Sequence, residues 1–287
     1  MTKNRDTEPI PEPPTSWDED VRKALHSSID KFFDRVTGAD KKAGQDASLD
    51  VSGRPGSTGF ELTDMLQELA ELDKRTWDRY VISTDMLRGK VDEEEGDRLA
   101  AQARDCGSTW ARRVRDEQRI TNPDELARRL GVEVSDNEAP VSGKRVLFAQ
   151  FVPDNHIDLM ADPLRRYREL RRQMLEEADS ERRSAVEALL PTPDTVRSLI
   201  LSHELFHVIE DQNESDIFTR TATIRLWKFL GFENRSTLRC LGEIGAGAFA
   251  QEYVGSRFCP FALDILLSWT YDAELSRSLF REVTACR

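Results

Sequence analysis

The sequence predicts a mostly helical α+β fold behind a disordered N-terminal segment, and three observations lead to this prediction. Residues 1–57 are rich in proline, acidic and small polar residues, so they can bury too little apolar surface to offset the entropy of an ordered chain. From residue 59 onward, apolar residues recur mostly at helical spacing. The run 146–152 is instead apolar and β-rich, and turn residues connect it to a second short run at 156–160, which predicts a β-hairpin.

These patterns divide the chain into three expected parts. Residues 1–57 are the largely disordered segment, residues 58–121 a helical N-terminal region, and residues 122–287 a further domain that contains the hairpin. One short helix is expected inside the first part, at 17–36, where apolar residues also follow helical spacing.

Glycine, proline and capping residues predict where several helices begin and end. Residues 92–120 are expected to form two helices with a break near Gly107. Asn122, Pro123 and Gly131 predict a short capped helix, because asparagine is a good N-cap, proline suits the first helical position and glycine suits the stop.

The rest of the chain is expected to be mostly helical. A long charged helix is expected from Asp162 and Pro163 to about residue 189, because acid–base pairs recur there at i,i+3 and i,i+4. Thr192 and Pro193 then begin a far more apolar helix. The other expected elements are a short strand at 132–134 and helices at 214–230, 236–254 and 261–285, the last as one or two helices.

The charge and composition of the chain argue against several classes of partner. With 41 lysine and arginine residues against 53 aspartate and glutamate residues, the formal net charge is −12, which disfavours binding to the phosphate backbone of nucleic acids. The N-terminus lacks the apolar core of a secretory signal, and no apolar stretch reaches the roughly 18 residues of a membrane span. We therefore expect a cytoplasmic protein with no nucleic-acid or membrane partner.

The cysteines indicate neither a zinc ribbon nor a disulfide framework. They stand at positions 106, 240, 259 and 286, and none are spaced as C-x-x-C. Buried free thiols in a reducing compartment are the expected state.

One short motif predicts metal chemistry. His203-Glu204-Leu205-Phe206-His207 has the form H-E-x-x-H, and its two histidines are one helical turn apart on the same face. Both rings can therefore direct a nitrogen at one zinc ion. Glu204 lies about 100° round the helix from His203, where a carboxylate can act as the catalytic base without ligating the metal.

The third zinc ligand is expected to be a carboxylate, because no histidine follows His207. Glu243 is the preferred candidate, since it begins a helical stretch rich in glycine and alanine, whose small side chains let two helices approach closely. Glu252, further along the same stretch, is the alternative. Four nearer acidic residues stay open as alternatives, although they are too close to the motif to fold back easily: Glu210, Asp211, Glu214 and Asp216.

The order of these elements resembles the ImmA/IrrE-type metallopeptidases, a branch of the gluzincin zinc peptidases. Across about residues 122–255, the similar features are a helix ending in LARRLGVEV, a hairpin, the H-E-x-x-H helix, and E-x-x-A-x-x-F-A from Glu243 to Ala250. The resemblance implies a zincin-like domain at 122–287 with Glu243 as the third ligand and a helical insertion at about 161–189. The chain departs from the family at Gly247, where relatives tend to have asparagine, and in showing no helix-turn-helix module.

The resemblance also implies a function. It indicates an intracellular metallopeptidase that holds one zinc ion per chain and hydrolyses a peptide bond in a protein or peptide substrate, a regulatory protein being one candidate. It further implies that an edge strand, within 146–152 or 156–160, takes up the substrate by strand addition. The alternatives are a zinc-binding regulatory protein without proteolytic activity, which would have no need of Glu204 as a base, and a helical interaction protein that carries the motif by accident.

Four more residues are candidates for supporting roles. A hydrogen-bond donor to the oxyanion is expected from His156, Tyr253 or Tyr271, which the sequence does not rank. Glu210 shares the helix face of the two motif histidines, so it can orient a ligand imidazole; otherwise it is a solvated residue near the helix end.

Overall fold

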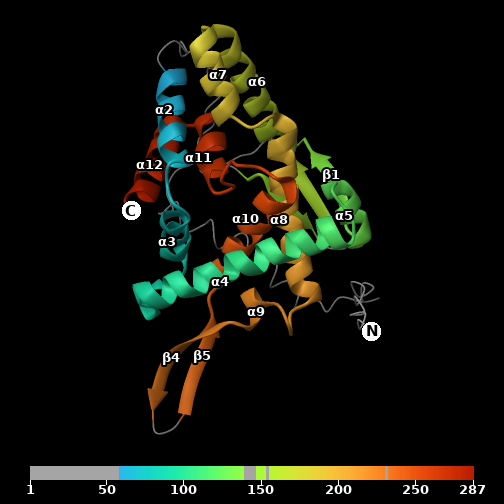
Figure 1. The fold of residues 1–287 in the computed structure, drawn as a ribbon, viewed down its shortest axis with the longest axis vertical. Helices are drawn as coiled ribbons and strands as arrows, with labels where there is room; N and C mark the ends of the chain where they lie inside the picture. Colours follow the sequence, from blue (N-terminus) through green and yellow to red (C-terminus); the bar gives the residue numbers. More distant parts are fainter. Residues whose placement is uncertain (1–57, 139–146, 153–154, 230–231) are drawn as a thin grey trace, which may run out of the picture.

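Two neighbouring helices, α8 (Pro193–Gln212) and α10 (Cys240–Val254), form the centre of the fold (Figure 1). The computed structural model describes residues 58–138, 147–152, 155–229 and 232–287. This part of the chain is an α+β fold in which helices predominate and the strands form two small sheets, as predicted. The segment 1–57, including the helix expected at 17–36, lies outside the described residues.

A long helix, α4 (Glu93–Arg112), packs directly on α10, and the break expected near Gly107 is wrong. The helix runs through Gly107 and continues as a π-helical turn at Arg113–Glu117. A Cβ atom on Gly107 would overlap the carbonyl oxygen of Gly245 in α10. This glycine therefore permits a close helix–helix contact and does not interrupt the helix.

The hairpin predicted at 146–160 is confirmed as part of a three-stranded sheet. Strand β2 (Ala149–Val152) pairs antiparallel with β3 (His156–Met160), and β1 (Glu133–Asn137) pairs parallel with β3, which gives the order β1-β3-β2. Strand β2 packs against α8. The strand expected at 132–134 begins one residue later and is longer than predicted.

The short helix before this sheet has the predicted caps. In α5 (Pro123–Arg129), the Asn122 side chain accepts hydrogen bonds from the backbone N–H groups of Asp124 and Glu125. Gly131 follows the helix with a φ of 72°, a left-handed conformation that glycine adopts without strain.

The prediction of one long charged helix from 162 to 189 is wrong in one respect, because this segment forms two helices. Helix α6 (Ala161–Glu177) ends at Ala178, whose backbone is extended, and α7 (Ser180–Leu189) begins after Asp179. The Asp179 side chain accepts a hydrogen bond from the backbone N–H of Arg182, so this residue starts a new helix as an N-cap.

The helix expected at 214–230 is also wrong. The chain forms only a short helix, α9 (Phe218–Thr221), followed by an antiparallel hairpin of β4 (Thr223–Phe229) and β5 (Phe232–Thr237) that projects from the body (Figure 1). Strand β4 is rich in β-branched and aromatic residues, which favour strands over helices. The expected helix at 236–254 consequently begins only at Cys240.

The remaining helices flank the centre, and all of them except a 3-10 turn contribute buried side chains to its core. They are α2 (Thr58–Ala70), α3 (Lys74–Thr84), the 3-10 turn η1 (Arg88–Lys90), α11 (Ala262–Trp269) and α12 (Ala273–Thr284). The last two confirm the helices predicted at 261–285. Buried side chains from 58–121 and from 122–287 belong to one hydrophobic cluster, and the boundary between these two parts stays a prediction. Among the described residues, no helix combines the length and the apolar character that crossing a membrane requires.

We predict that Gly107→Ala destabilises the protein by about 1–3 kcal/mol, because the added methyl group would push α4 away from α10. Gly96→Ala in the same helix is the matched control. Its Cβ would lie at ordinary contact distance, 3.4 Å from Ile82 Cδ1, so the higher helix propensity of alanine should leave stability equal or higher. Urea unfolding of both variants measures the difference, and equal effects at the two positions would contradict this account of Gly107.

Candidate metal centre

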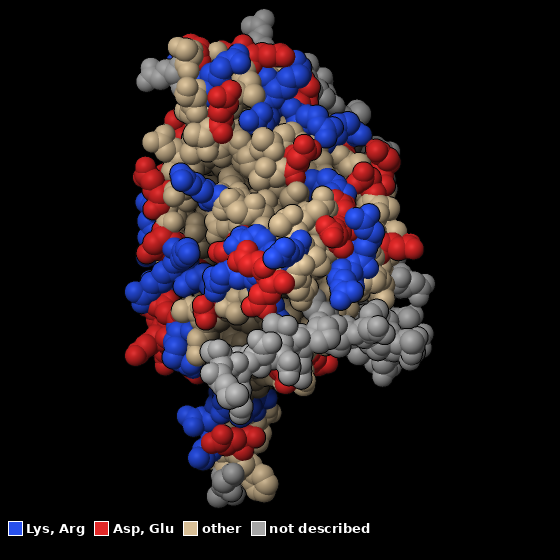
Figure 2. Space-filling model, turned by 45° about the vertical axis from the view of Figure 1, so that its right-hand side comes forward, with Lys and Arg blue, Asp and Glu red and all other residues tan. Residues whose placement is uncertain are grey.

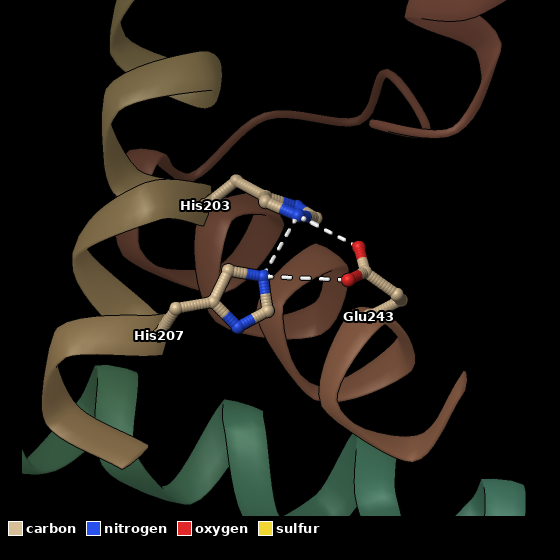
Figure 3. A group of neighbouring side chains, drawn as sticks. All are labelled: His203, His207 and Glu243. Atoms are coloured by element: carbon tan, nitrogen blue, oxygen red, sulfur yellow. Dashed lines mark hydrogen bonds and ion pairs between the residues drawn. The ribbon is translucent and has the colours of Figure 1, made fainter. Parts of the chain in front are cut away.

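The H-E-x-x-H motif lies in the second half of α8, where both histidines face α10 (Figure 3). The Thr192 side chain accepts a hydrogen bond from the backbone N–H of Thr195, and Pro193 occupies the first helical position, so the helix start is the predicted one. Apolar residues buried on the same helix hold it in the core, including Leu199, Leu205 and Phe206. The two imidazoles therefore project from a rigid element.

Glu243, in the first turn of α10, completes a group of three donor atoms. Its Oε2 atom lies 3.1 Å from His203 Nε2, and its Oε1 atom lies 3.7 Å from His207 Nε2. The two Nε2 atoms are 3.3 Å apart. Ligand atoms about 2.0–2.1 Å from a tetrahedral zinc ion are themselves about 3.3 Å apart, so this spacing fits a single ion. Within the described residues, these three form the group of histidine, cysteine and acidic side chains that could hold a metal.

The electrostatics of the cluster also suit a cation. Burial lowers the pKa of His207, but the carboxylates of Glu243, Glu210 and Glu204 outweigh it and raise that pKa to about 9. Burial raises the pKa of Glu204, against the opposing effect of the two histidines. Three carboxylates around two imidazoles thus produce a negative potential where the donor atoms converge.

Glu210 lies behind His207, on the side away from the other two donors. It is 1% exposed, and its Oε2 atom is 2.7 Å from His207 Nδ1. With the proton on Nδ1, His207 donates to Glu210 and keeps the lone pair of Nε2 for a metal. The predicted orienting position of Glu210 therefore matches the structure, and the solvated alternative is wrong. A Cβ on Gly242 would lie 3.2 Å from both carboxylate oxygens of Glu210, so the glycine leaves room for this contact.

The pocket over the cluster contains a tyrosine that the sequence did not indicate. Tyr80, from α3, and Asp264, from α11, line it together with His203, Glu204 and the other donors. Its apolar lining residues come from four parts of the chain: Val81, Phe148, Leu199 with Ile200, and the segment with Pro260, Phe261 and Leu263. Burial, followed by the nearby carboxylate of Asp264, raises the pKa of Tyr80, so its hydroxyl keeps its proton at neutral pH.

The three oxyanion donors expected from the sequence do not line this pocket. The ring nitrogen of His156 lies 2.9 Å from both Ser135 and Asp158 on the small sheet. The Tyr271 hydroxyl donates to Asp162 at 2.6 Å, and the Tyr253 ring stacks on Phe249 further along α10.

Glu252, the alternative third ligand, is also placed elsewhere. Its backbone and side-chain oxygens accept hydrogen bonds from Arg115, and it is not among the three donor residues.

The cysteines carry no disulfide. Cys240 is buried and the other three are half-buried, so the expected free thiols are confirmed, with less burial than predicted.

No protein-family model matches the chain, and searches of the curated proteins and of the solved structures returned no match. The case for a function therefore depends on the geometry of the three donors and of the pocket above them.

We predict that Glu210→Gln lowers zinc affinity about 10- to 100-fold, because the amide no longer fixes the protonation of His207. Titration calorimetry, or competition with a zinc-sensitive dye, measures the change. Glu214→Gln is the matched control, since Glu214 is exposed just beyond the same helix and should leave the affinity unchanged. An unaltered affinity in Glu210→Gln would show that this contact does not support the site.

Proposed function

We propose that this chain is a zinc-dependent peptidase of the ImmA/IrrE type that hydrolyses a peptide bond in a protein substrate. The observation that carries the proposal is the convergence of His203, His207 and Glu243 at tetrahedral spacing, with Glu204 lining the same pocket. Three protein donors are typical of catalytic zinc sites, whereas structural sites use four. A small sheet packed on the motif helix, and a third ligand from the next long helix, support a zincin-like domain.

The side chains of the pocket suit peptide hydrolysis. A bound zinc ion would supply an activated water and polarise the carbonyl group of the substrate. Glu204 accepts the proton of that water and delivers it to the leaving amine nitrogen, and its raised pKa suits a group that must hold a proton between the two steps. Glu210 keeps His207 in the orientation and protonation state of a ligand. Tyr80 donates a hydrogen bond to the carbonyl oxygen as negative charge develops there.

The sheet order favours one of the two segments expected to bind substrate. Strand β3 is central and pairs on both sides, whereas β2 is at the edge and packs against α8. Phe148, directly before β2, lines the metal pocket. A substrate in extended conformation can therefore add along β2 and reach the three donors, while 156–160 is not free to pair.

We predict that the purified protein binds about one zinc ion and that His203→Ala loses it. Glu204→Gln should keep the ion and lose hydrolysis, because it removes the base and leaves the three donors in place. Metal analysis and mass spectrometry of a digested peptide library measure the two effects. Glu252→Gln, on the same helix as Glu243, is the control that should change neither.

Two outcomes would contradict the proposal in different ways. A fully active Glu204→Gln variant would mean that another group is the base. A wild-type protein that binds zinc and cleaves no peptide would favour the regulatory, non-proteolytic alternative.

We predict that Tyr80→Phe lowers kcat about 10²- to 10³-fold with little change in KM, because the hydroxyl acts only as charge develops on the carbonyl oxygen. Steady-state kinetics on any peptide found by the library assay measures both constants. Tyr253→Phe is the matched control, since Tyr253 is a buried tyrosine outside the pocket. Equal kcat values for Tyr80→Phe and the wild type would exclude Tyr80 as the donor.

A further inference from the structure

The outer end of the β4–β5 hairpin is the most apolar exposed surface among the described residues. Its side chains Trp227, Phe229 and Phe232 are 51%, 66% and 74% exposed, and the other large exposed hydrophobic residue of the described chain is Met86. A two-stranded sheet is marginally stable alone in water, and clustered exposed aromatic residues mark contact surfaces. The hairpin therefore has the properties of an element that binds a partner.

The strand register places the three aromatic side chains on one face, here called the aromatic face. Phe229 pairs with Phe232, and Trp227 pairs with Asn234. Cross-strand partners and alternate residues share a face of a sheet, so all three rings point to the same side. Ile224 also belongs to this face, because it pairs with Ser236, which alternates with Asn234 and Phe232 along β5, and a register shift separates Arg225 from Trp227. Ile224 lies at the base of the hairpin and is 1% exposed. The body of the protein thus covers the base of the aromatic face and leaves its outer end exposed to solvent.

The opposite face is basic. Arg225, Lys228 and Arg235 lie 3.9, 3.2 and 3.7 Å from the single carboxylate of Glu233. Three cations against one acid leave a local charge of 3 − 1 = +2 on a chain whose formal net charge is −12. Figure 2 shows the hairpin standing clear of the body, with charged side chains next to the body and uncharged ones at the end.

We propose that the β4–β5 hairpin binds the surface of an anionic phospholipid membrane. Amphipathic helices that lie in a membrane interface carry tryptophan and phenylalanine on one face and lysine and arginine on the other, and this hairpin has the same division. The rings enter the boundary between headgroups and acyl chains, and the flexible cationic side chains reach the lipid phosphates. The membrane thereby contacts both the aromatic side chains and the basic side chains of the hairpin.

The projection of the hairpin explains how an acidic protein can approach an anionic surface. Strand β4 has 7 residues, which span roughly 20 Å, whereas charges are screened beyond about 8 Å at physiological ionic strength. The hairpin end can therefore touch the membrane while the acidic body stays beyond the range of repulsion. The proposal thus differs from the expectation of no membrane partner, which rests on the N-terminus and on the length of the apolar stretches.

A second copy of the chain is a weaker candidate for the same surface. A large aromatic residue can bury about 150–250 Å² in a contact. Each of these three residues is only half to three quarters exposed, so each can bury less than that on binding a partner. The aromatic face therefore offers well below the roughly 800 Å² per partner of a standard stable interface. Two hairpins would also bring together like charges.

Sedimentation of the full-length protein with lipid vesicles tests the proposal. The protein should bind vesicles of phosphatidylcholine and phosphatidylglycerol at low salt and dissociate from them at high salt. It should not bind vesicles of phosphatidylcholine alone. Combined Trp227→Ser, Phe229→Ser and Phe232→Ser should lower binding at least about ten-fold. Met86→Ser is the matched control, since it removes a side chain that is 59% exposed elsewhere, and it should bind as the wild type does.

Charge reversal tests the basic face separately. Lys228→Glu with Arg235→Glu should also weaken binding at least about ten-fold. Arg98→Glu with Arg182→Glu is the control, because these two side chains lie on helices away from the hairpin and are similarly exposed. Arg98 and Arg182 are 57% and 56% exposed, and Lys228 and Arg235 are 58% and 50% exposed. This control should leave binding unchanged.

Tryptophan fluorescence gives a readout that does not depend on the triple variant remaining folded. Anionic vesicles should shift the emission of the wild type to shorter wavelength, and Trp227→Phe should lose that shift. Equal binding to neutral and anionic vesicles, or an unchanged emission, would overturn the proposal. The proposal would also be overturned if the protein bound no vesicles and the aromatic residues were instead required for a dimer or for a complex with a single-stranded oligonucleotide. The Glu204→Gln variant should bind vesicles normally, so this test is independent of hydrolysis.

Discussion

The contact between α10 and α4 is the constraint on which the metal centre depends. The two helices approach so closely that Gly107 and Gly245 leave no space for a Cβ atom between their backbones. On its other side, α10 meets the Phe206 ring from α8, which a Cβ on Gly245 would approach to 2.9 Å. Metal sites tolerate ligand displacements of only about 0.2 Å. The position of Glu243 opposite the two histidines therefore depends on Gly245, two residues further along α10, and on Gly107 in another helix.

The first turn of α10 combines several requirements in a few residues. The backbone N–H of Cys240 donates to the buried carboxylate of Asp85 at 3.0 Å, which fixes the helix start against the end of α3. Gly242 leaves room for Glu210, and Glu243 faces His203. One helical turn thus anchors α10 to the end of α3, leaves room for the carboxylate behind His207, and carries the third donor residue.

The sequence predicts features that depend on neighbours along the chain, and it misses features that depend on distant ones. The helix caps at Asn122 and Thr192 and the pair His203 and His207 follow from local spacing, and the structure has all of them. The break expected at Gly107 is wrong because the contact that requires this glycine, with Gly245, is in another helix. Tyr80 carries no local signal, since only the packing of α3 brings it to a pocket built around residues more than a hundred positions later.

The β4–β5 hairpin is hard to predict from the sequence for a different reason. A strand is recognised from alternation between apolar and polar residues, but the register shift between Arg225 and Trp227 breaks this alternation in β4. Ile224 and Trp227 share a face although they are three residues apart, a spacing that is also typical of a helix. The structure places Glu243, and not Glu252, beside the two histidines, because the stretch of small residues that Glu243 begins does pack closely against its neighbours.

The order of the donor residues along the chain has a mechanical consequence. His207 precedes α9 and the β4–β5 hairpin, and Glu243 follows them. An ion held by both residues would act as a cross-link that closes this loop at its base, much as a disulfide closes the chain between two cysteines. Such a cross-link opposes local unfolding of the loop and couples metal affinity to the free energy of that opening. Metal binding would therefore add to the packing of α8 on α10 in holding the base of this loop closed.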